Sequence, residues 1–279
     1  MKKILLFGAT GGVGSHLTTF LDQRETVKFK FNQWNDLNLL SRALRQFLQE
    51  NCHENSTIIW VAGNSNPRSS AEEIESNAKV FDIFVESVAD ISISLEFVKI
   101  IYLSSTGSIY QFDNKKIYFE DSPPNPTSKY GFQKISQELM LSELSIIKSI
   151  SCIIVRSPAI FGSSHFKSTG ILNQIKFNRN FNLTTRLSTA RQYVHIDDLC
   201  ASIMKSISFT NFDKLLTKNL APPAIYSMES LILNHGDEDL IKRILSQRER
   251  FEQLEDETVI IGTRYALELD SSRYILPVN

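Results

Sequence analysis

The feature that most restricts the fold of this chain lies near its N-terminus: a short apolar run, a glycine-rich turn and an amphipathic segment follow one another directly. Residues Ile4 to Phe7 are all apolar, as expected of a strand buried on both faces of a sheet. The turn Gly8–Gly14 comes next, and apolar residues then recur at helical spacing. Strand, glycine turn and helix in this order are typical of a site that binds a dinucleotide pyrophosphate at the helix N-terminus.

The glycines of this turn have separate predicted roles. Gly8 permits a tight turn, Gly11 lets the backbone approach a pyrophosphate, and Gly14 lets the helix pack closely on the strand. A glycine-rich turn without a ligand is the alternative, which the strand before it and the helix after it disfavour. We therefore predict that the cofactor is bound by Gly8, Thr10, Gly11, Gly12, Val13 and Gly14.

The end of the second predicted strand bears on the choice between NAD and NADP. In a dinucleotide fold the residue there meets the adenosine ribose, where an acid favours NAD and repels a 2′-phosphate. This strand, Val27–Phe31, is followed by Asn32, so we prefer NADP and keep NAD as the alternative. Asp36 and Leu37 are predicted to contact adenine, although Asp36 could instead cap the helix Leu37–Leu48.

Predicted strands and helices alternate along the chain. Further strands are expected at Thr57–Ala62, Val98–Leu103 and Ser151–Arg156, and further helices at Glu72–Val88 and from about Ser128. This alternation predicts an α/β protein of Rossmann type with a doubly wound parallel sheet. Residues 111–128 are expected to form a polar loop, and residues 191–207 and 238–253 one helix each, with a strand at Thr258–Ile261.

Polar or small residues follow several of these strands. Open α/β sheets bind ligands at the carboxyl ends of their strands. The residues expected to contact the cofactor there are Ala62, Gly63, Ser104, Ser105 and Ser157. Asn77, in the middle of the helix Glu72–Val88, is predicted as a further hydrogen-bonding group on the cofactor side, with an ordinary solvated asparagine as the alternative.

A hydroxyl, a phenol and an ammonium group form the candidate catalytic set. Tyr130 and Lys134 lie one helical turn apart on the same face, and Thr106 lies 24 positions before Tyr130. A phenol with a pKa near ~10 in water needs a neighbouring cation to transfer protons near neutral pH. An ordinary pair on a helix surface is the alternative for Tyr130 and Lys134, and the upstream Thr106 and glycine turn disfavour it.

Composition excludes several other classes of protein. The formal net charge of the 279 residues is −1, with acidic and basic residues mixed, so we expect no nucleic-acid partner and no membrane surface. Apolar runs are too short for a signal peptide or a membrane span, which predicts a cytoplasmic protein. Cys52, Cys152 and Cys200 are isolated and lack ligand spacing, so we expect buried thiols and no disulfide or metal site.

Five motifs together resemble the extended short-chain dehydrogenase/reductase family, the NAD-dependent epimerase/dehydratase group that acts largely on nucleotide sugars. They are the glycine turn, Ser104-Ser105-Thr106 with Tyr110, Tyr130-x-x-x-Lys134, Arg156 with Phe161-Gly162, and Arg191-Gln192-Tyr193-Val194-His195-Ile196-Asp197-Asp198. The resemblance covers residue 1 to about residue 200 in the family's order. The chain departs from the family at Asn32, at Gln111 and in its short C-terminal part, which ends soon after Asp270-Ser271-Ser272-Arg273.

The resemblance implies a role for each matching side chain. Tyr130 corresponds to the general acid/base, Lys134 to the residue that binds the nicotinamide ribose and lowers the Tyr130 pKa, and Thr106 to the residue that binds the substrate oxygen. Arg191 corresponds to an arginine that holds the substrate diphosphate, with an ion pair to Asp197 or Asp198 as the alternative. His195 is expected to be structural, and Asp198 to cap or orient the following helix.

The predicted function is that of an NAD(P)H-dependent reductase of a nucleotide-diphosphate-linked 4-keto-6-deoxysugar. The alternatives are a nucleotide-sugar 4-epimerase with retained NAD and, from another class, a non-catalytic NAD(P)-binding sensor or scaffold. Residues 1–162 are predicted as the Rossmann domain, with 187–207 returning to it, and residues 163–186 and 208–279 as a small, partly interleaved substrate-binding lobe. The resemblance also implies a homodimer formed through two helices of the first lobe.

Overall fold

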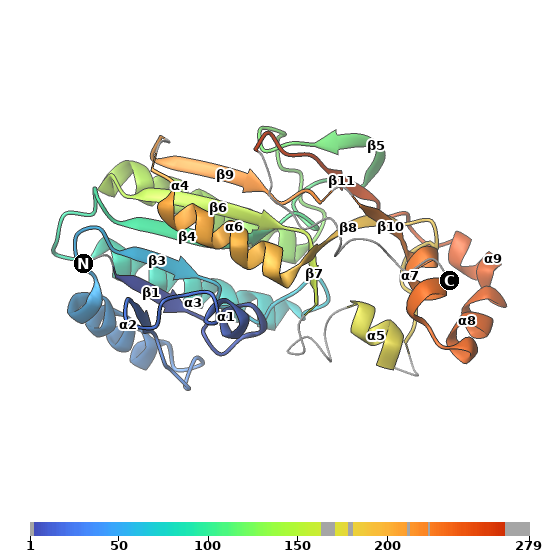
Figure 1. Cartoon of the computed structure of the whole chain (residues 1–279), viewed down its shortest axis with the longest axis horizontal. Helices are drawn as coiled ribbons and strands as arrows, with labels where there is room; N and C mark the ends of the chain where they lie inside the picture. Colours follow the sequence, from blue (N-terminus) through green and yellow to red (C-terminus); the bar gives the residue numbers. More distant parts are fainter. Residues whose placement is uncertain (1–2, 163–170, 178–180, 211–212, 223, 266–279) are drawn as a thin grey trace.

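A six-stranded parallel sheet forms the centre of the molecule (Figure 1). The computed structural model describes residues 3–162, 171–177, 181–210, 213–222 and 224–265. The strand order is β2-β1-β3-β4-β6-β9, and each neighbouring pair is parallel. These strands are β1 (Ile4–Phe7), β2 (Thr26–Lys28), β3 (Thr57–Trp60), β4 (Lys99–Ser105), β6 (Ser151–Ser157) and β9 (Leu215–Asn219). The predicted Rossmann-type α/β fold is confirmed.

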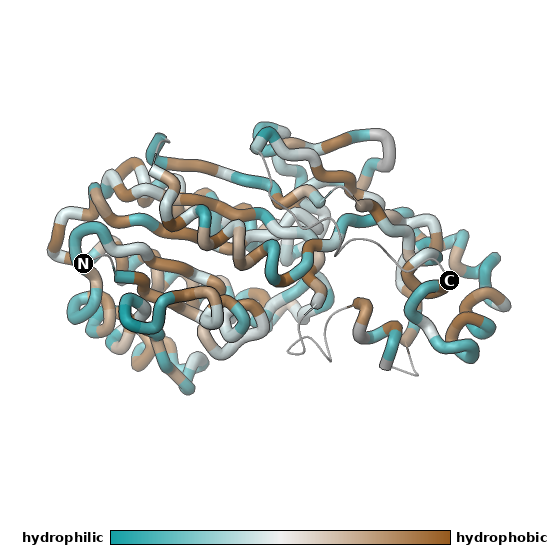
Figure 2. The backbone as a smooth tube through the Cα atoms, in the orientation of Figure 1, coloured by the Kyte–Doolittle hydropathy of each residue, from teal (hydrophilic) through white to brown (hydrophobic). Residues whose placement is uncertain are grey.

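Helices cover both faces of this sheet because successive strand residues point to opposite sides. Leu5 and Phe7 pack with apolar residues of α2 (Leu37–Asn51), α3 (Ala71–Ala89) and α4 (Lys129–Lys148). Ile4 and Leu6 pack with residues of α1 (Gly12–Leu17) and α6 (Ile196–Ser208). The central strands accordingly form a continuous hydrophobic band (Figure 2). Cys52, Cys152 and Cys200 are free and buried, as predicted.

The remaining elements lie beyond one end of this sheet (Figure 1). A three-stranded sheet contains β7 (Ala159–Phe161), β8 (Ala190–His195) and β10 (Ile225–Ser227), and a two-stranded sheet contains β5 (Asp113–Tyr118) and β11 (Val259–Ile261). The helices here are α5 (Ile171–Phe177), α7 (Met228–His235), α8 (Glu238–Leu245) and α9 (Arg248–Glu252). Residues of α5, α7, α8 and α9 share a separate hydrophobic core with Tyr193 of β8.

Four sequence predictions of local structure are wrong or incomplete. The expected loop 111–128 contains β5, which pairs with β11 from the C-terminal part of the chain. Residues 191–195 are a strand and not part of a helix, because β8 pairs with β7 and β10. The expected helix 238–253 is two helices, α8 and α9. The segment 208–279, assigned to the second lobe, includes β9, which pairs with β6 in the central sheet; the division into lobes itself stays a prediction.

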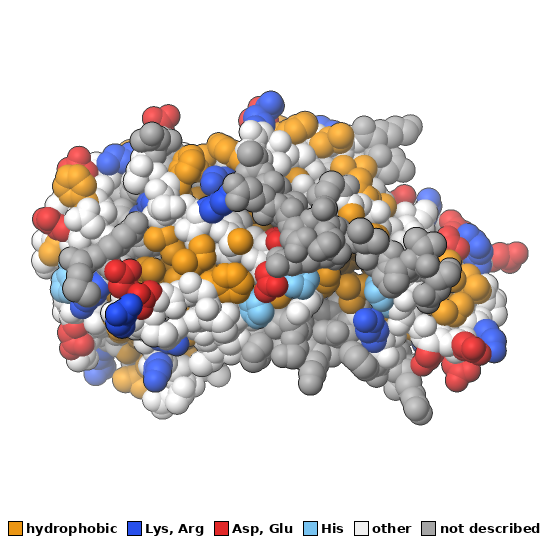
Figure 3. Space-filling view, viewed as in Figure 1, with side chains coloured by type: hydrophobic (Ala, Val, Ile, Leu, Met, Phe, Trp, Pro, Cys, Tyr) orange, Lys and Arg blue, Asp and Glu red, His pale blue; other side chains and the backbone are white. Residues whose placement is uncertain are grey.

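Acidic and basic side chains are interspersed over the face seen in Figure 3. None of the helices in the described ranges is long and apolar enough to cross a membrane.

The strand order and helix layers place the carboxyl ends of β1, β3, β4 and β6 at one edge of the sheet, where the candidate site lies.

Candidate active site

Two positions of the glycine turn, Gly8 and Gly14, leave no room for a side chain. Gly8 has a φ of +88°, a left-handed conformation that favours glycine, and a Cβ there would lie 2.6 Å from the Ala62 backbone nitrogen. A Cβ on Gly14 would lie 2.0 Å from the Gly8 carbonyl oxygen. The predicted roles of Gly8 in the turn and of Gly14 in helix packing are therefore visible in the backbone itself.

The same turn leads directly into the N-terminus of α1, where the pyrophosphate of a dinucleotide is predicted to bind. Gly11 is the N-cap of α1 and has no side chain with which to cap the helix. Its own N–H donates to the Gly8 carbonyl (3.0 Å), and a Cβ at this position would meet that oxygen at an ordinary 3.4 Å. The backbone N–H groups that begin at Gly12 and Val13 thus lie at a helix N-terminus, where partial positive charge favours an anion.

The predicted adenosine end of the site lies after β2. Asn32 is exposed there, as is Asp36. The Asp36 carboxylate accepts a hydrogen bond from the Leu39 N–H (3.0 Å) and so caps α2, which is the alternative considered for this residue. Leu37 is the first residue of that helix. Contacts from Asn32, Asp36 and Leu37 to a cofactor stay predictions.

Asn77 holds the loop that follows β3. Its Nδ2 donates to Asn64 Oδ1 (2.6 Å), and its Oδ1 accepts from the Asn64 N–H (3.1 Å). Gly63, with a φ of +128°, directly precedes Asn64 and its two hydrogen bonds to Asn77. Asn77 is therefore not a plain solvated residue, and its amide fixes the backbone at the predicted cofactor edge.

Gln133 is a second residue that fixes this loop, and the sequence analysis did not identify it. Its Oε1 accepts from the Ser65 hydroxyl (3.1 Å), while its Nε2 donates to the Ile74 carbonyl (3.0 Å). Gln133 is buried and directly precedes Lys134 on α4. The helix α4, which carries Tyr130 and Lys134, is thereby tied to the loop after β3.

Tyr130 lies in the first turn of α4, directly beside the segment that follows β4. Ser128 caps this helix by accepting a hydrogen bond from the Gly131 N–H (3.1 Å). A Cβ on Gly131 would lie 1.8 Å from the Ser108 carbonyl oxygen, so only glycine permits this approach. Burial raises the pKa of Tyr130 to about 12, while an interaction with the Ser105 side chain lowers it. The lowering of this pKa by Lys134, which the resemblance implies, stays a prediction.

Lys134 lies one turn further along α4. Its Nζ is 5.7 Å from the centre of the Tyr130 ring, which confirms that the two side chains are neighbours. Burial lowers the pKa of Lys134 to about 8, and the negative charge of Glu138 acts in the opposite direction. The Nζ donates a hydrogen bond to the Tyr102 hydroxyl (3.1 Å).

A buried ion pair joins Glu138 of α4, four residues after Lys134, to Arg156 of β6. Arg156 Nη2 is 2.6 Å from Glu138 Oε2, and the Arg156 Nε lies 3.1 and 3.2 Å from the two carboxylate oxygens. The Ser104 hydroxyl donates to Glu138 Oε1 (2.6 Å), and Arg156 Nη1 donates to the Tyr110 hydroxyl (2.7 Å). The Ser104 hydroxyl hydrogen is thus used within the protein. Glu138 was not predicted as part of the site, although its position four residues after Lys134 places it on the same helix face.

Thr106 and Ser157 join the ends of β4 and β6. The Thr106 N–H donates to the Ser157 carbonyl (2.9 Å), and both residues are buried. The Ser157 hydroxyl donates to the Pro158 carbonyl (2.9 Å). Thr106, Tyr130 and Lys134 therefore lie on adjoining segments at one edge of the sheet, while the contacts of Thr106 and Ser157 with substrate and cofactor stay predictions.

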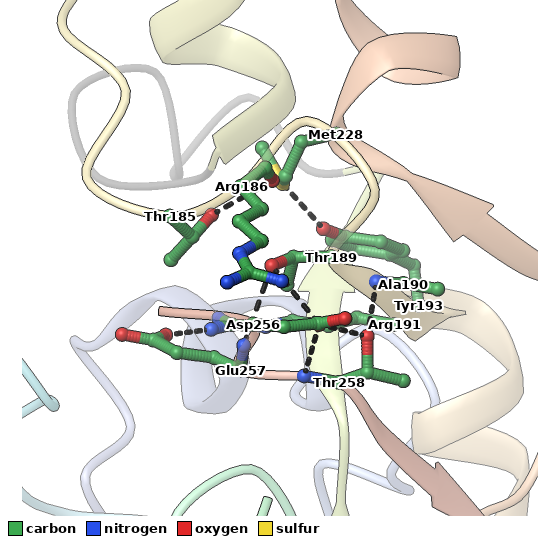
Figure 4. A network of polar contacts seen from close by, with 10 residues as sticks. All are labelled: Thr185, Arg186, Thr189, Ala190, Arg191, Tyr193, Met228, Asp256, Glu257 and Thr258. Carbon is green, nitrogen blue, oxygen red and sulfur yellow. Dashed lines mark hydrogen bonds and ion pairs between the residues drawn. The ribbon is translucent and has the colours of Figure 1, made fainter. Parts of the chain in front are cut away.

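Arg191 lies in a polar network between β8 and the segment before β11 (Figure 4). Its guanidinium forms an ion pair with Glu257, not with Asp197 or Asp198 as the alternative interpretation supposed. In the same network, Asp256 Oδ1 accepts hydrogen bonds from the Thr258 hydroxyl (2.6 Å) and the Thr189 hydroxyl (3.4 Å). The sequence could not indicate Glu257, because it lies far from Arg191 in the chain.

His195 and Asp197 connect the start of α6 to α1. His195 Nδ1 accepts a hydrogen bond from the Asp197 N–H (3.3 Å) and caps α6, in agreement with a structural histidine. Asp197 Oδ1 lies 2.6 Å from His16 Nε2 on α1. Asp198 is buried in the first turn of α6. These contacts bring the helix of the glycine turn and the motif around Arg191 together.

The model of the NAD dependent epimerase/dehydratase family matches residues 4–213. Among solved structures, the chain is similar to UDP-glucose 4-epimerase of Thermotoga maritima with UDP-glucose, at 16% identity over 99% of this chain and 94% of that chain, with a TM-score of 0.67. It is also similar to dTDP-4-dehydrorhamnose reductase of Bacillus anthracis with NADP, at 20% identity over 95% of this chain and 85% of that chain, with a TM-score of 0.64. A search of curated protein sequences found no match.

The similarity to these structures shows a shared fold, and the family match covers most of the chain. The glycine turn and the Tyr130–Lys134 pair lie within the matched range. The expected resemblance and the expected class of NAD(P)-dependent enzyme are both confirmed. This chain belongs to the NAD dependent epimerase/dehydratase family.

Proposed function

We propose that the protein is an NAD(P)H-dependent reductase of a nucleotide-diphosphate-linked 4-keto-6-deoxysugar. The observation that carries this proposal is the buried phenol of Tyr130 beside Lys134, at the sheet edge that also holds the glycine turn. The predicted strand Val27–Phe31 is observed as the shorter β2, and Asn32 lies in the segment after it. NADP is the preferred cofactor because Asn32 is not a carboxylate that would repel a 2′-phosphate. Among the neighbours of similar fold, the dTDP-4-dehydrorhamnose reductase was solved with NADP and a UDP-glucose 4-epimerase of Thermus thermophilus with NAD, so the preference for NADP rests on Asn32.

The chain's own residues bind, orient and donate a proton in the proposed reaction. A bound nicotinamide supplies the hydride that reduces the keto carbon. Tyr130 donates its phenolic proton to the keto oxygen, and Thr106 donates a hydrogen bond to that oxygen as negative charge develops. Lys134 binds the ribose and stabilises the phenolate left on Tyr130 by its positive charge. The turn from Gly8 to Gly14 binds the pyrophosphate through backbone N–H groups.

Reduction as the first step needs an acid that carries a proton when the keto substrate binds. Burial raises the pKa of Tyr130, which suits this acid role. A 4-epimerase begins in the opposite direction, because its base must first remove the proton of a sugar hydroxyl. The nucleotide-sugar 4-epimerase with retained NAD stays the second candidate, since UDP-glucose 4-epimerases share the fold.

Substrate binding is proposed to involve Arg191 and the small lobe, residues 163–186 and 208–279. The side chain of Arg191 is 36% exposed, so a diphosphate could reach it. A planar guanidinium suits a phosphate group by its paired N–H donors. Because Glu257 already pairs with Arg191, binding of the diphosphate would require Arg191 to exchange one anion for the other.

A homodimer is proposed on the outer face of α4. Phe132, Leu139 and Ile146 recur at seven-residue intervals along this helix and are 62%, 59% and 77% exposed. Ile147 is 74% exposed beside them. A stripe of large apolar side chains on one helix is suited to contact with a second copy of the same helix.

The function is tested by following the absorbance of reduced nicotinamide in a solution of the purified wild-type protein. NADPH and NADH are supplied in turn with dTDP-, GDP-, CDP- and UDP-linked 4-keto-6-deoxysugars. The proposal predicts oxidation of nicotinamide equal to the sugar added, with one nucleotide preferred. Absence of oxidation, together with NAD released on denaturing the protein, would support the epimerase; cofactor binding without turnover of any sugar would support a non-catalytic sensor.

A further inference from the structure

Tyr102 is a buried phenol in direct contact with the catalytic lysine. It lies on β4, two residues before Ser104, and is 1% exposed. Lys134 Nζ donates to its hydroxyl (3.1 Å) and lies 5.2 Å from the centre of its ring. The Tyr102 ring also packs against Phe81, with the two ring centres 5.1 Å apart. This phenol has no role in the proton transfer assigned to Tyr130.

The hydroxyl of Tyr102 is oriented by Gln137. It lies 2.5 Å from Gln137 Oε1, to which it donates its single hydrogen. Because that hydrogen is used, the lone pairs of the Tyr102 oxygen are left to accept from Lys134. Gln137 lies three residues after Lys134 on α4, so the helix carries both the lysine and the group that orients its acceptor.

Tyr102 stays a neutral acceptor over the pH range in which enzymes work. Burial raises its pKa well above the usual value for tyrosine, and the nearby Glu138 charge raises it further. Three titratable groups lie near the Lys134 ammonium. They are Tyr102 on β4, and Tyr130 and Glu138 on α4. Glu138 is itself bound to Arg156 of β6, so its charge is partly compensated.

We propose that Tyr102 is a positioning residue for Lys134, holding one of its three N–H donors so that the other two point to the cofactor. This inference rests on the proposed function, in which Lys134 binds the nicotinamide ribose. An acceptor 3.1 Å away also stabilises the charged form of Lys134, which burial disfavours. Without Tyr102, the lysine would lose its proton at lower pH and lose its fixed direction.

The test compares cofactor affinity across pH in two matched variants. Tyr102→Phe removes the hydroxyl that Lys134 contacts, whereas Tyr110→Phe removes another buried hydroxyl, bound to Arg156 and the Phe119 carbonyl. The dissociation constants of NADPH and NADH are measured by nicotinamide fluorescence from about pH 6 to pH 10, a range that brackets the pKa of Lys134. Thermal unfolding of each variant checks that it is folded.

In the wild type we expect affinity to fall as pH rises through about 8, where Lys134 loses its proton. Tyr102→Phe is expected to move this midpoint down by about one pH unit, the size expected for one hydrogen bond to a charged donor. Tyr110→Phe should keep the wild-type midpoint. Gln137→Met, which removes the acceptor of the Tyr102 hydroxyl, should move the midpoint in the same direction by a smaller amount.

A wild-type midpoint in Tyr102→Phe would overturn this inference while leaving the proposed function in place. If Tyr102→Phe did not fold, a wild-type midpoint in Gln137→Met would have the same meaning. A wild-type protein that bound neither NADPH nor NADH would overturn the proposed function and this inference together. Binding by the wild type with a shifted midpoint in Tyr102→Phe would support the positioning role even before a sugar substrate is identified.

Discussion

Replacing Arg156 with methionine would leave the Glu138 carboxylate buried without its cation. The two side chains are 6% and 7% exposed, so water cannot solvate the carboxylate in place of the guanidinium. Glu138 would lose contacts with Arg156 Nη2 (2.6 Å) and Nε (3.1 and 3.2 Å) and would keep the Ser104 hydroxyl (2.6 Å). Methionine fills a similar volume, so the main effect is electrostatic.

The expected loss of stability is large. Breaking a buried ion pair by removing one partner destabilises a protein by about 3–5 kcal/mol, because the remaining charge is desolvated and unpaired. The free energy of unfolding of a whole domain is only about 5–15 kcal/mol. Removing both charges in Glu138→Leu/Arg156→Met should restore most of the lost stability, because a buried pair contributes little over apolar residues of similar size.

The assay is urea unfolding followed by circular dichroism, with the denaturation midpoint and slope fitted for each variant. Lys79→Met is the matched control, since the Lys79–Glu75 pair is exposed at 53% and 68% and its loss should leave the midpoint near that of the wild type. An Arg156→Met variant within about 1 kcal/mol of wild type would refute the reasoning, since breaking a buried pair should cost several times that. So would a double variant less stable than the single one.

Three further predictions concern the glycine turn, pH and the end of α6. Gly14→Ala should disrupt folding, because its Cβ would lie 2.0 Å from the Gly8 carbonyl oxygen. In Gly11→Ala the Cβ would lie 3.4 Å from that oxygen, so this variant should keep the wild-type Tm but bind NADPH more weakly in a fluorescence titration. Reductase turnover should fall as pH rises through about 8, because the depressed pKa of Lys134 removes its charge there; a rate that rises through this range would contradict the role of the ammonium. Lys99→Met should lower stability by about 1–3 kcal/mol in thermal unfolding, because the buried Lys99 ammonium satisfies three carbonyls at the end of α6.

The first part of the chain was predictable because its signals are local. The strand β1, the turn after it and α1 are contiguous, and the glycines that the turn requires are visible as residue types. Tyr130 and Lys134 share a helix face through their spacing alone. The structure adds that position 131 must be glycine, because a Cβ there would collide with the Ser108 carbonyl oxygen. Only the packing of α4 against the segment after β4 reveals this requirement.

The second part was less predictable because its elements depend on distant partners. The strand β11 agrees with the strand predicted at Thr258–Ile261, but its partner β5 lies far away in the chain and is too polar to be predicted as a strand by itself. The sequence predicts β8 as part of a helix because this strand leads directly into α6. The partner of Arg191 is Glu257, a residue that no local pattern connects to it. Pairings over such separations are set by tertiary packing.

The network beneath the catalytic pair shows the same limit within the site. Glu138 could be placed on the face of Lys134 by spacing, but its burial and its bonds to Arg156 and Ser104 come from the packing of α4 on β4 and β6. Gln137 and Tyr102 likewise meet across a helix and a strand. Sequence thus predicts which groups carry the chemistry, and the structure shows which groups hold the predicted ones in place.

The measurement that tests the central claim most directly is the turnover of Tyr130→Phe beside wild type, with reduced nicotinamide and the 4-keto-6-deoxysugar nucleotide that the wild type prefers. Phenylalanine preserves the packing of the ring, which is 9% exposed, and removes the proton donor alone. The account predicts a loss of about 10²–10⁴-fold in kcat, the usual contribution of a general acid, with cofactor affinity retained. A Tyr130→Phe variant with wild-type turnover would contradict it.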